Sequence, residues 1–267
     1  MMTVKDRTDS WHQLAERFDV FFVDLWGVLI DGEQCFPYAV EWLTFLKNRG
    51  KAVVLISNTP TLGTVMSEQL SSIGISPTFY QAIVTSGDTT RYLLGGDRGA
   101  NKTIVGSRYY YIGEAQHERL LQGLPYSRVN QPDEAEFILL TATDSAFQNP
   151  QDFQVFLERK MTMLCVNPDL HVLSLLGEKQ FCAGSVAQMY ERLGGVAIYI
   201  GKPFLDIFAL AHSSVNFTDK AGIIMVGDTL HTDIKGALDY GIETALVNKE
   251  LSSQDIKPDR VFVQFTQ

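Results

Sequence analysis

The fold is decided by residues 20–24, which read Val20-Phe21-Phe22-Val23-Asp24. A short continuous apolar run rich in β-formers is typical of a strand that is covered on both faces, as in a parallel sheet. The run ends abruptly at an acid, which places Asp24 at the carboxyl end of the predicted strand. Ligands of open parallel sheets bind outside this end of the strands. Asp24 is therefore the first candidate for a functional residue.

Three other apolar runs repeat the pattern of a strand that ends at a polar group. They are residues 52–56 before Ser57, 197–200 before Gly201-Lys202, and 223–226 before Gly227-Asp228. Helical patterns begin at Pro37 and Pro60 and are followed by glycines, the usual order of helix boundary signals. Strands that alternate with helices predict right-handed βαβ units. The polar residues after these strands are therefore expected to converge with Asp24 at one sheet edge.

A second series of strands and helices lies between about residues 86 and 184. Its predicted strands are residues 103–105, 109–112, 137–141 and 163–166, and residues 152–160 are expected to form a helix. The sequence therefore predicts an α/β protein with a three-layer Rossmann-like parallel-sheet core, residues 1–85 and 185–267. An α/β cap domain, residues 86–184, is inserted into this core.

Composition and charge exclude several classes of function. The formal net charge is −9 and no cluster of basic residues interrupts it, which argues against nucleic acid and anionic membranes as partners. The three cysteines form no C-x-x-C spacing, so neither a disulfide framework nor a zinc site is indicated. The amphipathic N-terminus lacks an apolar signal core, and no apolar run reaches membrane-spanning length. We expect a cytoplasmic protein.

The polar residues at the predicted strand ends suit metal-assisted phosphoryl chemistry. Such a site needs a carboxylate that attacks phosphorus, further acids that hold Mg²⁺, and cationic or hydroxyl donors for the phosphate oxygens. Asp24 would be the nucleophile, and Asp228 and Asp233 would be the metal acids. Ser57 and Lys202 would hold the phosphate. The expected ligand is a small phosphorylated metabolite.

This arrangement resembles the haloacid dehalogenase superfamily of phosphatases over nearly the whole chain. Its four motifs are matched in order and spacing by residues 23–29 (Val-Asp-Leu-Trp-Gly-Val-Leu), 56–58 (Ile-Ser-Asn), 201–203 (Gly-Lys-Pro) and 226–233 (Val-Gly-Asp-Thr-Leu-His-Thr-Asp). Residues 167–169 and 182–184 are similar to segments of class IIA, which has a large α/β cap. That class includes nitrophenylphosphate, phosphoglycolate and nucleotide or pyridoxal phosphatases.

The resemblance implies hydrolysis through an aspartyl-phosphate on Asp24. Mg²⁺ would be held by the Asp24 carboxylate, the Trp26 backbone carbonyl and Asp228, with Asp233 acting directly or through water. Lys202 would neutralise the remaining negative charge.

Substrate contacts are expected from two parts of the chain. Ser57, Asn58 and Lys202 would bind the phosphate. Asn167 and Asp169, in the cap, would reach the leaving group, although a turn that ends a strand explains these two residues equally well. A homodimer through the cap is one alternative for the oligomeric state.

One position departs from the family pattern. Superfamily phosphatases usually carry a second Asp two residues after the nucleophile, which protonates the leaving oxygen, and this chain has Trp26 there. An indole cannot act as an acid or a base in this range, so we expect slow hydrolysis. Asp31 is an alternative acid if the segment around it is a flexible turn. A simple Asp-Gly turn is the other interpretation of that segment.

Two other functions remain open. The chain could bind a phosphorylated metabolite without turnover and act as a regulatory protein. It could also be a dehalogenase, because dehalogenases lack the second Asp and place an aromatic residue there. Dehalogenation needs neither Mg²⁺ nor a phosphate clamp, so Asp228, Asp233 and Lys202 favour a phosphorylated ligand.

Overall fold

A computed structural model describes residues 11–32, 34–95, 106–173, 179–247 and 256–262. The chain divides into two compact units. The first consists of Met1–Ser57, Gly63–Val84 and Lys202–Gln267, and the second of Asn58–Leu62 and Thr85–Gly201. Among the residues that the structure describes, no helix is both long and apolar enough to cross a bilayer.

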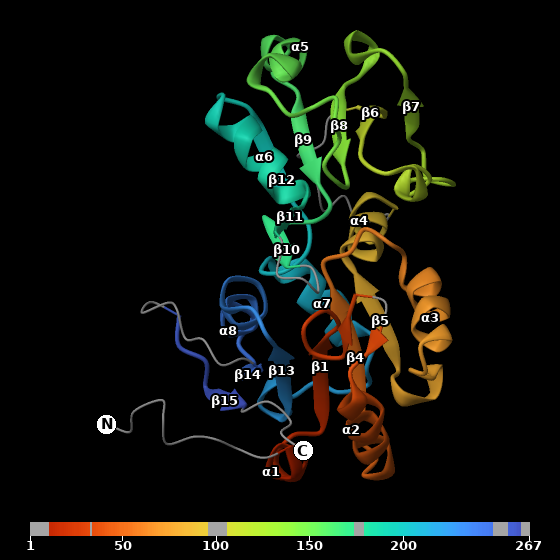
Figure 1. Cartoon of the computed structure of the whole chain (residues 1–267), viewed down its shortest axis with the longest axis vertical. Coiled ribbons are helices and arrows are strands. Elements are labelled where there is room, and N and C mark those ends of the chain that lie inside the picture. Colours follow the sequence, from red (N-terminus) through yellow and green to blue (C-terminus); the bar gives the residue numbers. More distant parts are fainter. Residues whose placement is uncertain (1–10, 33, 96–105, 174–178, 248–255, 263–267) are drawn as a thin grey trace. The chain divides into compact units, whose positions relative to one another are not determined.

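The first unit is built on a six-stranded sheet in the order β15-β14-β13-β1-β4-β5 (Figure 1). Its strands are β1 (Val20–Asp24), β4 (Ala52–Ser57), β5 (Ala82–Thr85), β13 (Ile223–Gly227), β14 (Glu243–Val247) and β15 (Arg260–Phe262). The pairs from β15 to β4 are parallel. A small hairpin of β2 (Ile30–Asp31) and β3 (Gln34–Cys35) follows β1.

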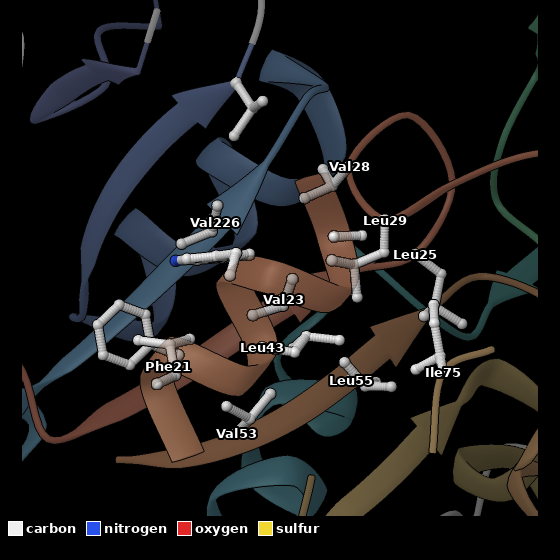
Figure 2. Packing of buried hydrophobic residues seen from close by; sticks show 14 of the residues in the cluster. Phe21, Val23, Leu25, Val28, Leu29, Leu43, Val53, Leu55, Ile75 and Val226 are labelled. Carbon is white, nitrogen blue, oxygen red and sulfur yellow. The ribbon is translucent and has the colours of Figure 1, made fainter. Parts of the chain in front are cut away.

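Helices cover both faces of this sheet. They are α1 (Trp11–Arg17), α2 (Pro37–Asn48) and α3 (Gly63–Ser72) on one face, and α7 (Leu205–Ser213) and α8 (Lys235–Tyr240) on the other. Successive side chains of β1 alternate between the faces: Phe21 and Val23 pack with α2, while Val20 and Phe22 pack with α7. Figure 2 shows Phe21 and Val23 gathered with Leu43 of α2. This packing confirms the predicted three-layer parallel-sheet fold.

The second unit contains a separate parallel sheet in the order β12-β9-β8-β6-β7. Its strands are β6 (Arg108–Ile112), β7 (Ser127–Val129), β8 (Phe137–Leu140), β9 (Thr162–Cys165) and β12 (Val196–Tyr199). Helices α5 (Gln154–Glu158) and α6 (Ala183–Arg192) pack on one face, and α4 (Ser86–Gly95) on the other. Strands β10 (His171–Leu173) and β11 (Lys179–Phe181) form an antiparallel hairpin.

The second boundary of the insertion differs from the expected one. We expected the core to resume at residue 185, whereas the second unit extends to Gly201 because α6 packs on its core and β12 pairs with β9. A short apolar run predicts a strand but not the sheet that the strand joins. The expectation that the run at 197–200 belongs to the sheet of Asp24 is therefore wrong, because this run lies in the sheet of the second unit.

Three other predicted elements differ from the structure or lie outside its described residues. The strand predicted at residues 103–105 lies outside the described residues. The helix predicted at residues 152–160 is a 3-10 turn, Pro150–Phe153, followed by the short α5. The helix expected to start at Pro60 begins at Gly63.

Candidate active site

The ends of three neighbouring strands bring polar residues to one edge of the six-stranded sheet. Asp24 ends β1 and lies opposite Ile56 of β4, so that Ser57 extends one residue further. On the other side of β1, Val23 lies opposite Val226 of β13, which continues through Gly227 into Asp228. The parallel register therefore places Ser57 and Asp228 on either side of Asp24, as the sequence predicted.

Three carboxylates form a cluster at this edge. Asp24, Asp228 and Asp233 each offer an oxygen, and these oxygens lie within 4.8 Å of one another. Asp24 is 6% exposed and Asp233 is fully buried, while Asp228 is partly exposed. The first unit thus gathers three acids that are far apart in the sequence.

Lys202 supplies the positive charge of the cluster. Its Nζ lies 2.5 Å from Oδ1 of Asp24 and 2.7 Å from Oδ1 of Asp233, and the residue is 3% exposed. Lys202 was expected to follow a strand of the same sheet. Instead it is the first residue of the first unit after the chain returns from β12.

Burial and repulsion between the acids set the protonation of the cluster. Burial, followed by the negative charge of Asp233, raises the pKa of Asp24 well above its usual value, and Lys202 only partly opposes this shift. The same two causes raise the pKa of Asp228 to about 7. Burial lowers the pKa of Lys202, but Asp233 and Asp24 outweigh it and leave the pKa above its usual value. Lys202 is therefore charged, and without a bound cation Asp24 and Asp228 hold their protons more tightly than free carboxyls do.

Two glycines allow the loops to approach these acids. Gly27 has φ +80°, and a Cβ on it would lie 2.1 Å from Oδ2 of Asp228. A Cβ on Gly227 would lie 2.3 Å from Cβ of Asp233. Larger residues at either position would displace a carboxylate, so the backbone itself forms part of the wall of the site.

Thr229 is a site residue that the sequence analysis did not single out. Its hydroxyl donates to Oδ1 of Asp228 at 3.0 Å, and its backbone N–H donates to Oδ2 of Asp233 at 3.1 Å. Asp233 lies on a π-helical turn, Leu230–Ile234, which continues into α8. The signal available in the sequence was the position of Thr229 directly after a candidate metal acid.

The donor set suits a divalent cation that prefers oxygen ligands. Three carboxyl groups share one small volume with a single lysine. A bound cation would relieve the repulsion that raises the pKa values of Asp24 and Asp228. The expected contribution of the Trp26 backbone carbonyl stays a prediction.

The segment after Asp24 has a defined conformation. Trp26 is 43% exposed and forms an isolated bridge with Ile30. Asp31 belongs to β2, pairs with Gln34 and directly precedes a turn at Gly32. A role of Asp31 as a substitute acid stays a prediction.

The remaining predicted substrate contacts belong to the second unit and lie close to one another there. Nδ2 of Asn58 donates to Oδ1 of Asp169 at 2.9 Å, and Oδ1 of Asn167 accepts from the Asp169 backbone N–H at 3.0 Å. These three residues thus form a hydrogen-bonded group. Their expected contacts with a substrate stay predictions.

Comparison with known proteins identifies the family. Residues 21–126 match the family model described as haloacid dehalogenase-like hydrolase, and residues 199–266 match one described as HAD-hydrolase-like. The chain is 27% identical over 239 residues to the ribonucleotide monophosphatase NagD of Escherichia coli K12, covering 87% of this chain and 88% of NagD. It is 22% identical over 260 residues to a 4-nitrophenylphosphatase of Schizosaccharomyces pombe, covering 89% of this chain and 86% of that protein.

A solved structure gives the same result. The crystal structure of a haloacid dehalogenase-like hydrolase from Brucella suis 1330 is 30% identical, with a TM-score of 0.78, and the match covers 91% of this chain and 93% of that one. The strand-end acids, the buried lysine and the inserted second sheet agree with these matches. The chain belongs to the haloacid dehalogenase-like hydrolase family.

Proposed function

We propose that the protein is a Mg²⁺-dependent hydrolase of small phosphate monoesters that works through an aspartyl-phosphate on Asp24. The observation that carries this proposal is the buried Lys202 amine, which lies between Asp24 and Asp233 in a cluster that also contains Asp228. Similarity to a ribonucleotide monophosphatase and a 4-nitrophenylphosphatase supports it.

Asp24 is the residue that reacts with phosphorus. One of its carboxylate oxygens forms a bond to phosphorus while the bond from phosphorus to the ester oxygen breaks, and the leaving group departs as an alcohol or phenol after taking a proton from solvent. A water molecule then attacks phosphorus, which releases inorganic phosphate and restores the carboxylate. The ionised form of Asp24 is required. Burial and Asp233 raise the pKa of Asp24 and oppose that form, whereas the charge of Lys202 favours it and a bound cation would favour it further.

Lys202 and Ser57 would bind the phosphate oxygens. Lys202 carries a fixed positive charge in a dry site, where its interaction with developing negative charge is stronger than in water. Ser57 ends the strand beside β1 and is 2% exposed. Both groups are held before the substrate arrives, so little reorganisation accompanies the reaction.

The acids and one backbone carbonyl would hold the cation. Asp24, Asp228 and Asp233 supply carboxylate oxygens, and Trp26 would supply its carbonyl oxygen. Bound Mg²⁺ would neutralise charge between the nucleophile and the phosphate dianion. Thr229 orients two of these carboxylates through its hydroxyl and its N–H.

Trp26 limits the rate. It occupies the position where similar enzymes carry a general acid, and such an acid typically contributes about 10²–10⁴-fold. The leaving group must therefore depart without a proton from the protein, which favours esters of acidic alcohols such as phenols. We propose slow turnover for this reason.

A second candidate function is metabolite binding without turnover, and the absence of an acid at Trp26 is the observation that favours it. A dehalogenase is the weaker alternative, because it would leave Asp228, Asp233 and Lys202 without a role. We also propose a cytoplasmic location and a homodimer through the second unit.

The test is phosphate release from 4-nitrophenyl phosphate by the purified protein. We expect release that requires Mg²⁺, is abolished by EDTA and is lost in Asp24→Asn. The matched control is Asp19→Asn, because Asp19 is an exposed acid of the same unit, paired with Lys51. Equal rates for the wild type and Asp24→Asn would refute the proposal, whereas Mg²⁺-dependent binding of phosphate esters without product would select the binding function.

A further inference from the structure

Asn58 is the residue that follows Ser57, and the second unit holds it from several sides. Its side chain is 4% exposed and donates through Nδ2 to Oδ1 of Asp169 at 2.9 Å. The two residues are 111 positions apart in the chain. A hydrogen bond that joins an amide to a carboxylate is stronger than one between neutral groups.

The backbone around Asn58 is held as well. The hydroxyl of Ser86, at the start of α4, donates to the carbonyl oxygens of Asn58 at 2.7 Å and Thr59 at 2.8 Å. Gly87 packs so closely on this segment that a Cβ on it would lie 2.1 Å from the Pro60 carbonyl oxygen. The start of α4 therefore fixes the position of the main chain, and Asp169 fixes the orientation of the side chain.

The Asn58 amide also packs against the residue that precedes Lys202. A Cβ on Gly201, which has φ +128°, would lie 2.6 Å from Oδ1 of Asn58 and 2.9 Å from Cδ of Pro168. Only glycine leaves room for this approach. The amide thus contacts Gly201, which directly precedes Lys202, and bonds Asp169, which belongs to the loop at 167–169.

The loop that carries Asp169 is itself immobilised within the second unit. Oδ1 of Asn167 accepts from the Asp169 N–H at 3.0 Å. A Cβ on Gly184, in the first turn of α6, would lie 2.2 Å from the Pro168 carbonyl oxygen and 2.6 Å from that of Asp169. Asp169 therefore presents its carboxylate to Asn58 from a rigid support.

We propose that Asp169 is a positioning residue, which acts through Asn58 rather than on the substrate. It holds the Asn58 amide against Gly201 and so fixes the peptide segments that lead to Ser57 and Lys202, the two predicted phosphate ligands. This inference rests on the proposed function. It replaces the expected contact of Asp169 with the leaving group.

The physical reason is the precision that phosphoryl transfer demands. Displacement of a positioned group by about 1 Å can cost on the order of 10²-fold in rate. Ser57 directly precedes Asn58, and Lys202 directly follows Gly201, against which Asn58 packs. Loosening Asn58 therefore changes the freedom of both. A positioning role predicts the same loss for every phosphate ester, whereas a contact with the leaving group predicts a loss that depends on the ester.

The experiment compares kcat and KM of Asp169→Ala on 4-nitrophenyl phosphate and on glycerol phosphate. We expect kcat to fall by about 10–100-fold, by the same factor on both esters, with little change in KM. In the Asn58→Ala background, Asp169→Ala should have no further effect, because residues that act as a unit are not additive. Asp133→Ala, which removes an exposed acid of the second unit, is the matched control.

A reciprocal exchange protects the test against variants that fold poorly. Asn58→Asp places two carboxylates together and should lose activity, while the double variant Asn58→Asp with Asp169→Asn restores one amide and one carboxylate and should recover most of it. The inference would be overturned if the kcat losses of Asn58→Ala and Asp169→Ala were additive or if the loss were confined to one ester. It would also be overturned if the exchange variant folded but did not recover activity. If Asp24→Asn keeps wild-type activity, the proposed function fails instead.

Discussion

The two parallel sheets of this protein have the same architecture but different residues at their strand ends. In the six-stranded sheet, β1 and β4 end at Asp24 and Ser57. In the five-stranded sheet, β8 and β9 are followed by Thr141 and Val166, which are 1% and 0% exposed. Thr141 shares a 2.7 Å hydrogen bond with Tyr111 of the same sheet. A parallel sheet provides a place for a site, but the side chains at its strand ends decide whether chemistry follows.

The difference extends to charge. Among the residues that the structure describes, the group of His, Cys, Asp and Glu side chains close enough to share a metal ion is Asp24, Asp228 and Asp233 in the first unit. The interior of the second unit is filled by apolar clusters on both faces of its sheet. Polar substitutions at the strand ends should therefore change activity in the six-stranded sheet and stability alone in the five-stranded sheet.

The largest expected effect is a gain of activity at the six-stranded sheet. Trp26→Asp introduces the missing acid at a position that is 43% exposed, so its cost in stability is small. We expect kcat for phosphate esters of poor leaving groups to rise by up to about 10²–10⁴-fold. Steady-state kinetics on an alkyl and an aryl phosphate would measure it, and an unchanged rate would mean that proton transfer does not limit turnover.

Removal of the buried positive charge of Lys202 has the second-largest expected effect. Lys202→Met leaves Asp24 and Asp233 without their shared partner, and loss of one member of a buried pair typically costs about 3–5 kcal/mol of the unfolding free energy. Urea denaturation would measure it. Lys51→Met, which breaks an ion pair with the exposed Asp19, should cost less than about 1 kcal/mol. Similar losses for the two variants would contradict the electrostatic account.

The third effect is a dependence of stability on pH in EDTA. Burial and Asp233 raise the pKa of Asp228 to about 7 in the folded state, above an unfolded value of about 4. Between these values the folded state binds more protons, so its stability should fall as pH rises from about 4 through 7, by roughly a few kcal/mol. Asp228→Asn should flatten this slope in urea titrations, and an unchanged slope would assign the dependence to other groups.

The smallest effect belongs to the five-stranded sheet. Thr141→Val removes the hydrogen bond between Thr141 and the Tyr111 hydroxyl. In the variant, the Tyr111 hydroxyl still donates to the Glu114 carbonyl oxygen. We expect a loss of about 0.5–1.5 kcal/mol in unfolding free energy and an unchanged kcat. A large loss of activity would show that the strand ends of the second sheet take part in the reaction.

The sequence was sufficient for features that are local. An apolar run that ends at Asp24, Ser57 or Asp228 predicts both a buried strand and the end of it that is a candidate site, because the apolar residues and the polar residue are adjacent in the sequence. The fold class followed from the repetition of this pattern, and the structure confirms it.

Features that depend on distant partners could not be predicted. The strand at 196–199 joins β9 rather than the six-stranded sheet, and a short apolar run carries no information about its partner. The bond from Asn58 to Asp169 joins residues that are 111 positions apart. Thr229 bonds two acids, one of which lies on a π-helical turn, and only the assembled site reveals these bonds.

The most direct measurement is a crystal structure of the protein grown with Mg²⁺ and orthovanadate, a mimic of the transferring phosphoryl group. The account predicts one cation held by Asp24 and Asp228, with vanadium facing a carboxylate oxygen of Asp24 and its own oxygens bound by Ser57 and Lys202. Vanadate bound elsewhere, or a cation that avoids these acids, would contradict it.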